Sequence, residues 1–140
     1  MPTIKVTFNI QSLKEVENKI NLQDFPAEGL PVCSSRLGLE ITHTDTQIAV
    51  NVKVLSTYEG KLVMSYVVEG IFSFEDIAQY FDFDEEQITD KVGVLPTLVG
   101  IVVDALRGMQ ALRLTGTPYY TILPYINPAQ LLEVTNSKKK

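Results

Sequence analysis

The 140-residue sequence has little of what enzymes and metalloproteins commonly use, because it contains one histidine, one cysteine and no tryptophan. A single cysteine cannot form an intrachain disulfide, which fits a reducing compartment. No cluster has the ligand spacing of a zinc site, and neither a phosphate-binding loop nor a GxGxxG fingerprint occurs. A nucleophilic pair of Cys33 and His43, or paired acid-base carboxylates, remain as alternatives. The composition favours a binding protein that needs no cofactor over an enzyme.

Long apolar runs and basic clusters are also scarce. No run reaches the roughly 18 apolar residues of a membrane-spanning helix. The first apolar residues alternate with polar ones, unlike those of a signal peptide. We therefore expect a cytoplasmic protein without membrane insertion. The formal net charge of −5 argues against a nucleic-acid partner, since phosphates are neutralised by lysine and arginine. The basic run 138–140 is typical of a solvated tail.

Alternation of apolar and polar residues predicts four strands. The first covers 4–11, and a connection without sustained period follows over 15–35. The second begins near Arg36, the third covers 47–54 and the fourth begins at Lys61 and ends at about Phe74. Short polar turns separate the last three strands, and connections this short join antiparallel neighbours.

Helical signals occupy the rest of the chain. Asp84 and Gln87 have the spacing of a capping box, which predicts a short helix over 85–91. The acidic cluster Asp82, Asp84, Glu85 and Glu86 would then complement the helix dipole, with a calcium site as the less favoured alternative. Pro96 and the apolar spacing that follows predict a longer helix from about Leu95. Asn127 followed by Pro128 predicts a closing helix over 129–134.

These elements predict a single α+β domain. A four-stranded antiparallel sheet covers about 4–74, helices cover about 85–135, with one long and one short C-terminal helix, and a basic tail covers 136–140. On the long helix, Gly100, Asp104 and Gly108 lie four residues apart along one line. Each interior glycine costs about 1 kcal/mol relative to alanine, so a close backbone neighbour is expected there. Intrachain packing, simple tolerance of the glycines and a contact between subunits are all compatible with this line.

Four segments, taken in order, are similar to a known family. Residues 66–73, with sequence YVVEGIFS, resemble the end of the fourth strand in the SecB family of bacterial protein-export chaperones. The family also has a long helix begun by proline and followed by Gly-Thr, as in 95–117 here. Residues 124–127 with the leucines that follow resemble its loop and terminal helix, and 8–11 resemble its first strand. The similarity extends from about Phe8 to Leu132.

The resemblance implies a SecB-like fold and a function. SecB proteins are homotetrameric holdases that bind unfolded preproteins, use no cofactor and deliver their clients to the SecA motor. Their apolar groove is formed by the second strand, the loop between the two major helices and the final helix. Carried over by position, the polypeptide-binding residues would be Leu37, Leu39, Ile41, Tyr119, Tyr120, Ile122, Tyr125 and Leu131. The oligomer interface is predicted from the helical spacing and not from the resemblance, and it would include Gly100, Asp104 and Gly108.

The sequence departs from the family pattern at the surface presented to SecA. Ser65 stands where the family's fourth strand carries a glutamate, and the acidic stretch after the first strand is replaced by KEVENK over 14–19. The chain ends in lysines rather than acids, and the family's tryptophan before the second strand is absent. These departures argue against a dedicated transfer to SecA. An antitoxin-type adaptor with one client fits equally well, and a small-ligand-binding module is a further alternative.

Overall fold

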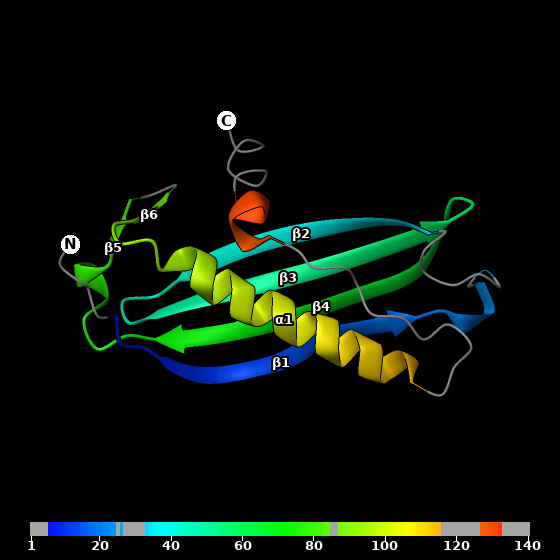
Figure 1. Cartoon of the computed structure of the whole chain (residues 1–140), viewed down its shortest axis with the longest axis horizontal. Coiled ribbons are helices and arrows are strands. Elements are labelled where there is room, and N and C mark those ends of the chain that lie inside the picture. The colour runs from blue at the N-terminus through cyan, green and yellow to red at the C-terminus, as the bar shows by residue number, and fades with distance from the viewer. Residues whose placement is uncertain (1–5, 25, 27–32, 85–86, 116–126, 133–140) are drawn as a thin grey trace.

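The structure is a computed structural model that describes residues 6–24, 26, 33–84, 87–115 and 127–132. It confirms the α+β class. The main sheet contains β1 (Asn9–Ile20), β2 (Ser34–His43), β3 (Gln47–Tyr58) and β4 (Lys61–Ser73), in the order β1-β4-β3-β2 with antiparallel neighbours. Helix α1 (Leu95–Leu114) crosses one face of this sheet diagonally, and a short helix over 128–132 lies beside it (Figure 1). Single 3-10 turns occupy η1 (Leu22–Asp24) and η3 (Ile77–Gln79).

The predicted extent of the first strand was wrong. β1 begins at Asn9 and continues to Ile20, through part of the segment that was expected to be a connection. Its pairing with β4 shifts register between Ile10 and Ser12 and again between Glu15 and Glu17. Each bulge inserts an extra residue, which moves the following side chains to the other face and breaks the period of two. The alternation that identified the other strands is therefore interrupted in β1.

The predicted helix over 85–91 was also wrong. The flanking residues form a small two-stranded sheet of β5 (Phe81–Phe83) and β6 (Ile88–Asp90). The backbone N–H of Gln87 donates to Asp84 Oδ1 at 2.6 Å, and the N–H of Asp84 donates to the Gln87 carbonyl at 3.0 Å. The same Asp-x-x-Gln spacing that resembles a capping box here closes a hairpin turn, because an aspartate side chain can bond to the backbone in either setting.

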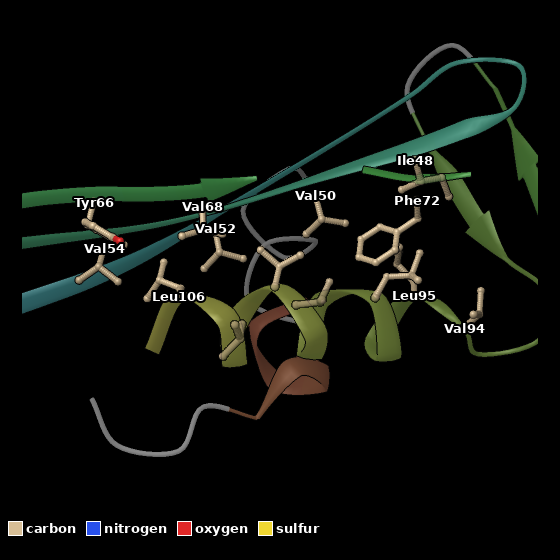
Figure 2. Close-up of a cluster of buried hydrophobic side chains, with 14 of the residues drawn as sticks. Ile48, Val50, Val52, Val54, Tyr66, Val68, Phe72, Val94, Leu95 and Leu106 are labelled. Atoms are coloured by element: carbon tan, nitrogen blue, oxygen red, sulfur yellow. The ribbon is translucent and has the colours of Figure 1, made fainter. Parts of the chain in front are cut away.

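The core lies between α1 and the sheet. Alternate residues of β3 and β4, among them Val50, Val52 and Val68, are completely buried and point toward the helix (Figure 2). The helix contributes Leu98, Val102 and Leu106 to the same core, and all three are fully buried. Gly70 lies where α1 closely approaches the sheet: a Cβ there would lie 2.6 Å from Val102 Cγ2, well inside van der Waals contact.

Asp90 fixes the start of α1 from outside the helix. The N-cap residue, Val94, makes no capping bond of its own. Instead, Asp90 Oδ1 accepts the backbone N–H groups of Gly93 at 2.8 Å and Val94 at 3.0 Å, and Oδ2 accepts that of Leu95 at 2.6 Å. A weaker bond at 3.3 Å comes from Val92. One carboxylate at the end of β6 therefore satisfies most of the free donors at the helix N-terminus.

A second side-chain cluster fixes the end of α1 to β1. Arg113 Nε and Nη2 donate to the two carboxylate oxygens of Glu15 at 2.8 and 2.5 Å. The buried hydroxyl of Tyr66 donates to the same carboxylate. The hydrogen bond from Arg113 lowers the pKa of Glu15, against the opposing effect of burial and with help from Tyr66. Burial and Glu15 together raise the pKa of Tyr66, so its proton stays in place.

The long helix is apolar on more than its buried side. Among the described residues, α1 is the one helix whose length and composition would suit a membrane span, and 44% of its 18-residue apolar window is buried within the protein. Packing against the sheet explains this apolar character in large part.

Candidate functional site

The strand predicted to bind polypeptide lies at an edge of the main sheet. β2 pairs with β3 on one side and ends the strand order. Leu37, Leu39 and Ile41 are half-buried on the side of β2 that faces the helix layer, and they pack against the core. Each of these side chains packs partly against the core and is partly exposed to solvent. Together they form a row of partly exposed apolar side chains along an edge strand.

The closing helix predicted over 129–134 is confirmed where it is described, since a helix covers 128–132. Asn127 Oδ1 accepts the backbone N–H of Ala129 at 2.9 Å and that of Gln130 at 3.3 Å, as expected of an N-cap. Leu131 and Leu132 are half-buried and pack against the same core as the β2 residues. The remaining predicted binding residues, Tyr119, Tyr120, Ile122 and Tyr125, lie outside the described residues.

The three residues predicted for an oligomer interface have different surroundings. A Cβ at Gly100 would lie 3.2 Å from Pro128 Cγ, so part of the closing helix already approaches it. The Asp104 side chain is exposed and its Oδ1 lies 3.7 Å from Arg107 Nη1. Gly108 is exposed, and a Cβ there would have nothing within 4 Å. Intrachain packing thus accounts for the first glycine, whereas no described residue packs closely enough to account for the second.

The other face of the main sheet carries charges of both signs. Cross-strand partners share a face, so the register identifies the residues that point away from α1. The cations are Lys14, Lys19, Arg36 and Lys53, and the anions are Glu17, Glu40 and Glu69. Ser65 donates a hydrogen bond to Glu17, and that bond, together with nearby Lys53 and Lys19, lowers the pKa of Glu17. This face is therefore balanced in charge rather than acidic.

The catalytic alternative for Cys33 and His43 is contradicted by their positions. Cys33 precedes the first residue of β2 and His43 is its last. Ten steps along a strand separate them by about 33 Å, far beyond hydrogen-bond reach. The His43 ring instead stacks on Phe83, with ring centroids 3.9 Å apart. This contact joins the end of β2 to the small sheet, and sequence spacing gave no sign of it.

The acidic cluster has structural partners where it is described. Asp82 Oδ1 lies 3.1 Å from Lys91 Nζ, and Asp84 belongs to the hairpin turn. No group of three or more potential metal ligands occurs among the described residues. Asp82 and Asp84 thus have structural roles in the β5-β6 hairpin, and Glu85 and Glu86 lie outside the described residues.

No family model matches the chain, and no curated protein matches it either.

Proposed function

We propose that this chain is a SecB-like polypeptide-binding protein that holds non-native chains in the cytoplasm, without catalysis and without a cofactor. The observation that carries the proposal is the row of half-buried apolar side chains on an edge strand, Leu37, Leu39 and Ile41. Extended non-native segments are rich in apolar side chains, and such a row gives them surface to bury. The order of sheet, long helix and short helix supports the same proposal, since it is the order that the resemblance implies.

Suppression of aggregation tests this function. We expect the protein to suppress light scattering by a chemically denatured model protein at stoichiometric amounts. Leu37→Asp should raise the amount required by about tenfold, because burial of one leucine contributes about 1.5–3 kcal/mol.

Gly38→Asp is the matched control, since it places the same charge one residue away on the opposite face, where the nearest atom to its Cβ is Lys53 Cβ at 3.9 Å. Circular dichroism checks that both variants fold. The proposal fails if the wild-type protein does not reduce scattering, and the assigned surface is wrong if both variants act alike.

A dedicated adaptor with a single client is the second candidate. The main-sheet face that points away from α1 carries charges of both signs and does not form an acidic docking surface. This charge balance favours the adaptor over a SecA-coupled export factor. Affinity purification after cross-linking distinguishes the two. One dominant client supports the adaptor, whereas a broad set of unfolded preproteins supports the general holdase.

The assembly that we propose is a homo-oligomer formed through α1. Ile101, Ala105, Gly108 and Leu112 recur at spacings of four, three and four, which is the spacing of a helix-helix seam. Ile101 and Ala105 are half-buried, and Leu112 is 71% exposed. In an antiparallel pair with a twofold axis between Ala105 and Gly108, Ile101 of one copy faces Leu112 of the other. The open space at Gly108 would allow the close approach.

Leu112→Lys should convert this assembly to single chains of 15.6 kDa, as measured by light scattering. A charged side chain in the seam would lose its water without gaining a partner. Leu62→Lys is the control, because Leu62 is also an exposed leucine, at 41%, but lies on β4. A wild-type monomer, or dissociation by the control alone, would contradict this interface.

A further inference from the structure

The two edges of the main sheet differ in how well they could accept another strand. β1 is interrupted by two register shifts and carries Lys14, Glu15, Glu17 and Lys19. Bulges and charges of this kind hinder pairing at an exposed edge. β2 pairs with β3 over its 10 residues without a register shift. In the described part of the chain, the outer edge of β2 is therefore a regular strand edge to which no further strand is bonded.

The hydrogen-bond pattern identifies the residues with outward backbone groups. The N–H of Thr44 donates to the Gln47 carbonyl at 2.9 Å, next to the start of the β2-β3 register. Bonded and non-bonded pairs alternate in an antiparallel ladder. Thr42 and Glu40 therefore direct their backbone groups toward β3. Leu37, Leu39 and Ile41 direct theirs outward, so the residues with the accessible apolar side chains also carry N–H and C=O groups to which no described strand is bonded.

We propose that a client segment pairs with the outer edge of β2 as an additional strand of the sheet. This inference rests on the proposed function and specifies how the client is held. Three residues with one outward N–H and one outward C=O each offer about six backbone hydrogen bonds. Their side chains lie on one side of the sheet, so the added strand should place apolar residues on that side and polar residues on the other. The preferred client is an extended chain with apolar residues at every second position, rather than any apolar peptide.

N-methylated peptides test the backbone contribution without changing a side chain. The probe is a fluorescein-labelled peptide with the sequence of residues 47–57, QIAVNVKVLST, which has the required alternation. One version carries N-methyl groups at the positions of 48, 50, 52 and 54, and the other at those of 49, 51 and 53. Every second N–H of a strand points to the same edge, so one version should lose at least about tenfold in affinity by fluorescence anisotropy and the other should stay close to the parent.

The outcomes separate strand addition from side-chain docking. Equal binding by both methylated versions, or equal loss by both, would overturn pairing along a single edge. Failure of the unmodified peptide to bind would overturn it too. If aggregation is still suppressed in any of these cases, strand addition fails while the proposed holding function stands. If the protein neither suppresses aggregation nor binds the probe, both proposals fail.

A pair of variants tests the same contact from the protein side. Leu39→Pro removes an outward N–H that β3 does not use, and proline is tolerated at such edge positions. Leu39→Ala shortens the side chain but keeps the N–H. We expect Leu39→Pro to weaken probe binding at least about fivefold more than Leu39→Ala, since backbone bonds are lost only in the former. Equal weakening would count against the backbone contact, and the methylated peptides decide the question if the proline variant does not fold.

Discussion

Replacing Asp90 with alanine should lower the free energy of unfolding by about 3 kcal/mol, because buried donors at the start of α1 would lose their acceptor. Val94 and Leu95 are buried, so water cannot readily replace the carboxylate at their N–H groups. The negative charge also complements the positive end of the helix dipole. Urea denaturation followed by circular dichroism measures the change. A loss below about 1 kcal/mol would show that the helix start does not depend on this side chain.

Asp90→Asn separates geometry from charge. Its amide oxygen can still accept the bonds that Oδ1 accepts, but its NH₂ group cannot accept the N–H of Leu95. We therefore expect an intermediate loss. Asp104→Asn is the matched control on α1, since Asp104 is exposed in the middle of the helix and its Oδ1 lies 3.7 Å from Arg107 Nη1, a distance typical of a weak surface ion pair. An equal effect of the two asparagine variants would contradict the capping role.

Asp90 also shows why part of the fold could not be predicted. Capping rules examine residues immediately before a helix, whereas this cap comes from the preceding strand, five positions before Leu95. The cap exists because β5 and β6 form a hairpin that places Asp90 at the helix start. The sequence around Asp84 is compatible with a helix as well as a turn, and local rules predicted the helix. Because the hairpin was not predicted, the cap that it provides through Asp90 was not predicted either.

Regular alternation explains the successful predictions. β2, β3 and β4 place apolar residues at every second position on the face toward α1 over most of their length, and this period of two identified them, although β3 and β4 also carry some apolar residues on the other face. In β1 the bulge between Glu15 and Glu17 shifts that pattern, and a shift of this kind is specified by pairing with β4. The second part of β1 was therefore not predicted as a strand, because its pattern depends on the pairing with β4.

For the candidate site, the sequence predicted the apolar row on β2 but not its setting. Alternation alone places Leu37, Leu39 and Ile41 on one side of a strand. It does not show that this strand is an edge, because strand order depends on which long-range pairs form. It also does not show which residues direct their backbone outward. That information comes from the register of the β2-β3 hairpin, and it changes the site from an apolar surface to an edge with hydrogen-bonding capacity.

Replacing Glu15 with alanine should lower the free energy of unfolding by about 2 kcal/mol at neutral pH. The hydroxyl of Tyr66 is completely buried and would lose its acceptor, and such a loss costs about 1–3 kcal/mol. The end of α1 would also lose its bidentate contact with β1 through Arg113. Thermal and urea denaturation measure the loss, and Glu40→Ala, on the exposed face of β2, is the control.

The contribution of Glu15 should depend on pH in a defined direction. Arg113 lowers the pKa of Glu15 in the folded protein below its ordinary value of 4.5. A group with a lowered folded pKa binds its proton more tightly in the unfolded chain, so its stabilising effect is complete above about pH 5 and declines as the pH falls through the folded pKa. The difference in stability between wild-type protein and Glu15→Gln should therefore be largest at pH 7 and should shrink toward pH 3. A difference that stays constant over this range would show that the bonds to Arg113 do not depend on the ionised carboxylate, and that packing alone fixes the end of α1 to β1.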